Sequence, residues 1–182
     1  MENEKAISRR KGLIIINTGN GKGKTTAALG LLVRAWGDDM KVVMLQFIKN
    51  RKANFGEHKA ARRMGIEIIA GGAGFVRPGV TKNIDKSMLM AQGLWEDAKQ
   101  KILSGDFDMV ILDELSYPLQ FDWLDMDDII SVLKQRPEKV HVVITGRGVP
   151  HELIDIADMV TEMNEIKHHL GKGIEAQPGI EY

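Results

Sequence analysis

Thr18-Gly19-Asn20-Gly21-Lys22-Gly23-Lys24-Thr25-Thr26 is the stretch that decides the fold of this chain. It follows an apolar run at residues 13–16 and leads into a helical pattern that begins at residue 27. A strand, a glycine-rich turn and a helix in this order are the setting of a phosphate-binding loop. The glycines let backbone N–H groups converge on an anion, and the helix N-terminus adds partial positive charge.

The loop is one residue shorter than the general P-loop pattern. That pattern places a glycine five residues before Gly23, where this chain has Thr18, and the nearest glycine is Gly19. Lys24 can still reach phosphate oxygens, and the Thr25 hydroxyl can hold a metal ion. We therefore predict that this loop binds the phosphates of a nucleotide. The predicted binding residues are Gly19, Asn20, Gly21, Lys22, Gly23, Lys24, Thr25 and Thr26.

A second motif supports this prediction, because four apolar residues, 109–112, are followed by Asp113 and Glu114. Consecutive carboxylates at the end of a buried strand are costly unless they are paired or bound to a metal. In P-loop proteins a carboxylate at this place meets the Mg²⁺ that accompanies the phosphates, directly or through water. We predict a site for Mg²⁺, or Mn²⁺ in its place, formed by Thr25, Asp113 and Glu114.

Predicted strands and helices alternate along the chain. We expect strands at residues 13–17, 41–47, 66–70, 107–112, 140–145 and 159–163, and helices at residues 24–36, 56–64, 83–104, 127–135 and 152–157. The alternation predicts an α/β fold of the three-layer P-loop NTPase type, with a mostly parallel sheet of about six strands and helices on both faces. We expect one domain over residues 1–182, with a polar lead-in at 1–11.

Polar residues follow several of these strands, at the sheet edge where ligands gather in open α/β folds. Gln46, Lys49 and Arg147 lie there, and Arg147 could contact a phosphate. The position of Gln46 is equally compatible with a side chain that faces water. Residues 71–79 are rich in glycine and contain Phe75, so they form either a loop that covers a substrate or a connection whose Phe75 packs on the core.

Composition excludes several kinds of protein. The 182 residues carry 25 basic and 25 acidic side chains, so the chain lacks the overall charge of a nucleic-acid binder. It has no cysteine for disulfides, no apolar run of membrane-spanning length and no signal-peptide core. We therefore expect a cytoplasmic protein without a membrane or nucleic-acid partner. His168 and His169 lack a carboxylate in register, so we predict no metal site there.

Taken together, the motifs resemble the P-loop type of ATP:corrinoid adenosyltransferase over nearly the whole chain. The resemblance rests on the shortened loop and on Gln46-Phe-Ile-Lys49, Met109-Val-Ile-Leu-Asp-Glu-Leu-Ser-Tyr117, Ile144-Thr-Gly-Arg-Gly148, Val160 to His168, and Ala176-Gln-Pro-Gly-Ile-Glu-Tyr182. It implies that a corrinoid reduced to Co(I) attacks C5′ of ATP, that the adenosyl group moves to cobalt, and that tripolyphosphate leaves. It places the reaction in the biosynthesis or salvage of adenosylcobalamin. The nucleotide is expected to lie reversed in the loop.

The resemblance also implies roles for single residues. Lys24, Thr25 and Glu114 are the expected catalytic residues, Arg147 a phosphate contact, and Phe75 a corrinoid contact that helps to exclude the lower axial base of cobalt. The family has an aromatic residue two positions after this phenylalanine, where this chain has Arg77. The expected partners are ATP, a reduced corrinoid, a flavodoxin-like or flavin reductase that supplies electrons, and a second copy in a homodimer.

Three other functions share some of these features: a recombinase-like P-loop ATPase that forms ADP, a small-molecule kinase, and a nucleotide sensor without catalysis. The neutral charge and the full set of motifs count against the first. The chain shows no arginine-rich lid of the kind that a kinase needs. Product analysis separates them all.

Overall fold

The computed structural model describes residues 11–50, 52, 54–72, 74 and 84–181. These residues contain one six-stranded sheet in which every pairing is parallel, in the order β3-β2-β4-β5-β1-β6. The strands are β1 (Ile14–Thr18), β2 (Val42–Asn50), β3 (Glu67–Gly72), β4 (Met109–Asp113), β5 (His141–Thr145) and β6 (Met159–Glu162). The predicted parallel sheet of about six strands is confirmed.

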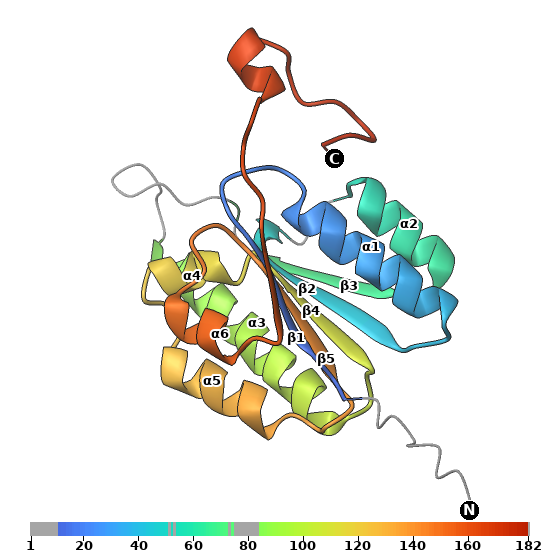
Figure 1. Cartoon of the computed structure of the whole chain (residues 1–182), viewed down its shortest axis with the longest axis vertical. Coiled ribbons are helices and arrows are strands. Elements are labelled where there is room, and N and C mark those ends of the chain that lie inside the picture. The colour runs from blue at the N-terminus through green and yellow to red at the C-terminus, as the bar shows by residue number, and fades with distance from the viewer. Residues whose placement is uncertain (1–10, 51, 53, 73, 75–83, 182) are drawn as a thin grey trace, which may run out of the picture.

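Helices cover both faces of this sheet (Figure 1). On one face lie α1 (Lys24–Gly37) and α2 (Gly56–Met64), and on the other lie α3 (Ile84–Ser104), α4 (Ser116–Gln120), α5 (Met126–Gln135) and α6 (His151–Ile156). The described residues form two separate hydrophobic cores, one on each side of the sheet. The three-layer prediction is therefore confirmed.

Strand β1 shows why the central strands read as continuous apolar runs. All five of its residues are buried, and the three that lie between the two helical layers are isoleucines, followed by Asn17 and Thr18 at the end that meets the P-loop. Ile14 and Ile16 join the core under α3 and α5, whereas Ile15 joins the core under α1. Side chains of a strand alternate between faces, so a strand covered on both sides needs apolar residues at every position. Each such burial contributes about 1.5–3 kcal/mol.

The structure differs from the sequence prediction in a few elements. Gly71 and Gly72 belong to β3 rather than to a loop, because the missing side chain of Gly72 lets it lie against the backbone of β2. In α3, the apolar residues Leu89 and Leu103 are exposed, so not every apolar residue of this predicted helix belongs to the core. The sequence analysis also missed α4, which is five residues long and has too few turns to show a helical period.

The chain beyond β6 leaves the sheet and turns back toward the N-terminal end of α1 (Figure 1). It contains one short 3₁₀ helix, η1 (His169–Lys172), which was also not predicted. No helix in the described part of the chain combines the length and the apolar character needed to span a membrane.

Candidate functional site

The P-loop connects β1 to α1 and packs against the chain just beyond β6. The Gly21 N–H donates to the carbonyl oxygen of Met163 at 2.6 Å. Gly19 has a φ of 94°, and a Cβ atom there would lie 2.5 Å from the same carbonyl oxygen. Glycine is therefore required at this position both by the backbone conformation and by the close approach of Met163.

Lys24 folds back onto this loop. Its Nζ atom donates to the carbonyl oxygens of Gly19 at 2.8 Å and Gly21 at 2.7 Å. The residue is only 6% exposed, so its side chain is buried in the loop rather than directed to solvent. Burial lowers the pKa of Lys24, while the nearby carboxylate of Glu114 acts in the opposite direction. The ammonium group is thus held at the centre of the loop, where it would meet a phosphate.

Asp113, at the end of β4, is the centre of a hydrogen-bond network. Its Oδ1 atom accepts from the hydroxyls of Thr25 at 2.8 Å and Thr145 at 2.7 Å, and its Oδ2 atom accepts from Gln46 Nε2 at 3.1 Å. The carboxyl group is 1% exposed. Burial raises the pKa of Asp113, and the hydrogen bonds from both threonines act against that increase. The structure therefore brings together Thr25 and Asp113, two of the three predicted metal ligands.

Glu114 has a left-handed backbone, with φ of 60°, which is uncommon for a residue with a side chain. Its N–H group donates to Thr145 Oγ1 at 2.9 Å. Burial is the largest influence that raises the pKa of Glu114, followed by the charge of Asp113, whereas Lys24 and Arg147 lower it. Backbone strain and a perturbed carboxyl group in one residue are features that cluster at functional sites.

Thr145 is a site residue that the sequence analysis missed. Its hydroxyl group donates a hydrogen bond to the Asp113 carboxylate and accepts one from the N–H group of Glu114. Only the pairing of β5 with β4 reveals this role. A polar residue at the carboxyl end of a buried strand was the available signal. Neither alternative for Gln46, a side chain that reaches a ligand or one that faces water, matches this structure, since Gln46 is fully buried and donates to Asp113.

Lys49 also has a different position from the one expected. It forms an ion pair with Glu57 of α2 and lies 4.7 Å from the ring centroid of Phe55. It is not among the residues that line the cavity described below.

Helix α4 fixes the loop that carries Arg147. Ser116 Oγ and Gln120 Nε2 donate to the carbonyl oxygen of Arg147 at 2.7 and 2.6 Å. A Cβ atom on Gly146, which has a φ of 153°, would lie 2.0 Å from Ser116 Oγ. The glycine lets the loop approach α4, and the two side-chain donors then hold the backbone of Arg147.

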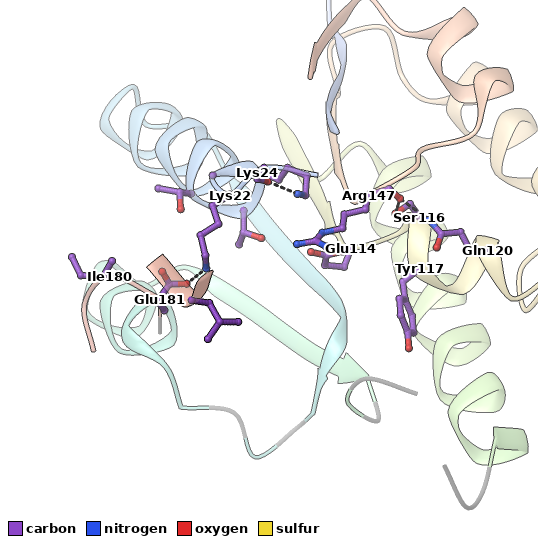
Figure 2. A pocket seen from close by; sticks show the side chains of 14 residues that line it. Lys22, Lys24, Glu114, Ser116, Tyr117, Gln120, Arg147, Ile180 and Glu181 are labelled. Carbon is purple, nitrogen blue, oxygen red and sulfur yellow. Dashed lines mark hydrogen bonds and ion pairs between the residues drawn. The ribbon is translucent and has the colours of Figure 1, made fainter. Parts of the chain in front are cut away.

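A cavity of about 870 Å³ opens above these groups (Figure 2). Predicted residues that line it are Gly21, Lys22, Gly23, Lys24, Thr25, Thr26, Glu114 and Arg147. Residues that the sequence analysis did not select are Ser116, Tyr117, Gln120, Leu170, Ile180 and Glu181. Gly19, Asn20 and Asp113 do not line it, although Asp113 bonds to Thr25 from below. Phe75 and Arg77 lie outside the described residues.

Similarity to known proteins shows the family of this chain. The family model of ATP:corrinoid adenosyltransferase BtuR/CobO/CobP matches residues 10–182. This chain belongs to that family. The resemblance seen in the sequence motifs is therefore confirmed, and the chain is a member of a transferase family.

Two relatives show the extent of this similarity. A corrinoid adenosyltransferase of Salmonella typhimurium is 40% identical over 172 residues, which cover 94% of this chain and 86% of the relative. A corrinoid adenosyltransferase of Pseudomonas aeruginosa is 37% identical over 192 residues, which cover 100% and 93%. Among solved structures, a KaiC-like protein of Pyrococcus horikoshii is 17% identical with a TM-score of 0.48, over 86% of this chain and 75% of that one.

The donor set of this adenosyltransferase family member suits a hard divalent cation. Hydroxyl and carboxylate oxygens are the ligands that Mg²⁺ prefers, and Thr25, Asp113 and Glu114 supply them. Within the described residues, no group of three or more His, Cys, Asp or Glu side chains could hold a metal ion alone. An ion at this site would therefore share its coordination with the phosphates of a nucleotide, as Mg²⁺ commonly does.

Proposed function

We propose that this protein transfers the 5′-deoxyadenosyl group of ATP to the Co(I) centre of a reduced corrinoid and releases tripolyphosphate. The observation that carries the proposal is the cavity lined by the shortened P-loop, Glu114 and Arg147, where Thr25 of the loop is hydrogen-bonded to the buried Asp113. Membership of the ATP:corrinoid adenosyltransferase family supports both substrates.

The proposed reaction is a displacement at carbon. Two electrons of Co(I) form a bond to C5′ of the ribose, the bond between C5′ and its oxygen breaks, and that electron pair leaves with the triphosphate. Cobalt ends formally as Co(III). Because the substrate supplies the nucleophile, the protein needs no general base, and its task is to orient ATP and stabilise charge on the leaving group.

The residues of the cavity suit that task. The N–H groups of the loop, the ammonium group of Lys24 and the guanidinium group of Arg147 would bind the triphosphate. Thr25, Asp113 and Glu114 would hold Mg²⁺, which would add positive charge beside the leaving group. Thr145, Ser116 and Gln120 act indirectly, because they fix Asp113 and the backbone of Arg147.

Anaerobic incubation with ATP, Mg²⁺ and chemically reduced cobalamin tests the proposal. We expect the Co(I) absorbance to fall while free tripolyphosphate appears in equal amount. Lys24→Ala, which removes the central ammonium group, serves as the matched control and should stop both changes. Stable Co(I) with ADP as the product would replace the proposal with an ATPase.

We further propose the remaining features that the family resemblance implies. Phe75 would contact the corrinoid, an external flavodoxin-like or flavin reductase would supply Co(I), and the protein would act as a cytoplasmic homodimer. Phe75→Ala should reduce the rate with complete cobalamin more than with a corrinoid that lacks the lower base. An equal loss with both would refute the role of Phe75 in excluding that base.

A further inference from the structure

The C-terminal segment, residues 163–181, contacts the P-loop at two places. At its start, Met163 donates its N–H to the Thr18 carbonyl oxygen at 2.9 Å and accepts from the Gly21 N–H at 2.6 Å. At its end, the Glu181 carboxylate forms an ion pair with the ammonium group of Lys22 (Figure 2). The segment therefore leaves the loop at Met163 and returns to it at Glu181.

These two contacts differ in how easily they can break. The first consists of backbone hydrogen bonds in a region so tight that a Cβ atom on Gly21 would lie 2.7 Å from the Met163 oxygen. The second is one side-chain pair, and the Lys22 side chain is 47% exposed. Single exposed ion pairs add little to stability. The base of the segment is thus fixed, whereas its end can detach.

The end of the segment forms one wall of the nucleotide cavity. Leu170, Ile180 and Glu181 line this cavity together with the loop. The Glu181 side chain is only 14% exposed, whereas the neighbouring Ile180 is 77% exposed. The Glu181 carboxylate is therefore covered, although the residue next to it in the chain is exposed.

The ammonium group of Lys22 is paired with the carboxylate of Glu181. The Lys22 side chain extends from the loop toward the C-terminal segment and away from Arg147 (Figure 2). His169 Nε2 lies 3.6 Å from the other oxygen of Glu181, which is longer than a hydrogen bond, so Lys22 is the main partner of this carboxylate. A triphosphate in the cavity would bring several negative charges next to Glu181, and like charges at this distance repel.

We infer that the Glu181 carboxylate binds Lys22 at the position where a phosphate oxygen of ATP would bind. ATP binding therefore releases the end of the C-terminal segment. This inference rests on the proposed binding of ATP by the P-loop. In the free protein the segment covers the cavity and neutralises Lys22. In the complex Lys22 binds the polyphosphate, and residues 170–181 move away from the loop while Met163 stays in place.

Calorimetric titration with ATP and Mg²⁺, without corrinoid, gives the first test. Glu181→Gln removes the competing charge, so we expect ATP to bind about two- to fivefold more tightly, the range for one partly exposed ion pair. Glu175→Gln, an exposed carboxylate of the same segment, is the matched control and should leave affinity unchanged. Lys22→Gln should weaken binding, and Glu181→Gln should raise the affinity less in that background than in the wild-type protein.

Limited proteolysis with trypsin tests the movement itself. Lys172 is exposed within the segment, and cleavage after it releases residues 173–182, which mass spectrometry identifies. We expect ATP to accelerate this cleavage in the wild-type protein and to change it much less in Glu181→Gln. Slower cleavage with ATP, or an unchanged or weaker affinity in Glu181→Gln, would overturn the inference while leaving ATP binding intact. If the wild-type protein binds no ATP, the inference and the proposed function fail together.

Discussion

Replacing Asp113 by asparagine should stabilise the protein while removing its activity. Asp113 is 1% exposed and accepts hydrogen bonds from Thr25, Thr145 and Gln46. Asparagine keeps the oxygen that both threonines bind. Its new amide nitrogen faces Gln46, whose Oε1 atom is buried and has no hydrogen-bond partner among the described residues. A flip of the Gln46 amide would let that oxygen accept from the asparagine.

The magnitude follows from two opposing effects. Neutralising the acceptor weakens three hydrogen bonds by about 1 kcal/mol each, or about 3 kcal/mol in all. Removing the charge recovers a desolvation penalty of about 4–5 kcal/mol. The asparagine variant should therefore be about 1–2 kcal/mol more stable at neutral pH, and urea unfolding in EDTA at unchanged slope would measure this difference.

The pH dependence provides an independent check of the cause. Burial raises the pKa of Asp113, so the folded protein binds a proton more tightly than the unfolded chain does. This effect makes wild-type stability fall as pH rises from the unfolded pKa toward the folded one. The advantage of the asparagine variant should consequently be absent near pH 4 and grow at higher pH. Asp155→Asn, at an exposed carboxylate of α6, is the control. An asparagine variant that is less stable than wild type at neutral pH would refute the reasoning.

Three further substitutions test other parts of the site. Lys24→Ala should lower adenosyl transfer by about a hundredfold or more with an unchanged circular dichroism spectrum, because one lost oxyanion donor has an effect of this size. Thr145→Val leaves Asp113 without one donor and the Glu114 N–H without its acceptor, so it should cost about 2–4 kcal/mol in urea unfolding, whereas Thr145→Ser should stay within about 1 kcal/mol of wild type. Gly146→Ala should lower stability by about 1–3 kcal/mol through its clash with α4, and a melting temperature equal to wild type would contradict the close packing seen there.

The sequence was sufficient to predict the sheet and the edge of the sheet at which the candidate site lies. Strands buried on both faces need apolar residues at every position, and this local requirement is visible at β1, β2, β4 and β5. The phosphate loop is also local, since its glycines, Lys24 and Thr25 are neighbours in the chain. The carboxyl ends of parallel strands meet at one edge, so Asp113 and Arg147 could be placed beside the loop in advance.

The remaining features depend on contacts between residues far apart in the chain. The hydroxyl of Thr145 can donate to the Asp113 carboxylate only because β5 pairs with β4. Gln46 donates to the same carboxylate because β2 pairs with the other edge of β4. Lys24 is buried because its ammonium group turns back to the loop carbonyls, a conformation that spacing alone does not specify.

The C-terminal segment shows most clearly the difference between what the sequence predicts and what long-range contacts decide. Its sequence is polar and rich in glycine, and neither property indicates a position in space. In the structure Glu181 lies against Lys22, 159 residues earlier in the chain, because β6 pairs with β1 and brings Met163 to the loop. The sequence by itself determined the phosphate-binding loop and the layers around it, since these follow from local backbone geometry and from burial. Only the tertiary structure decided which distant side chains complete the site, because their placement depends on strand order.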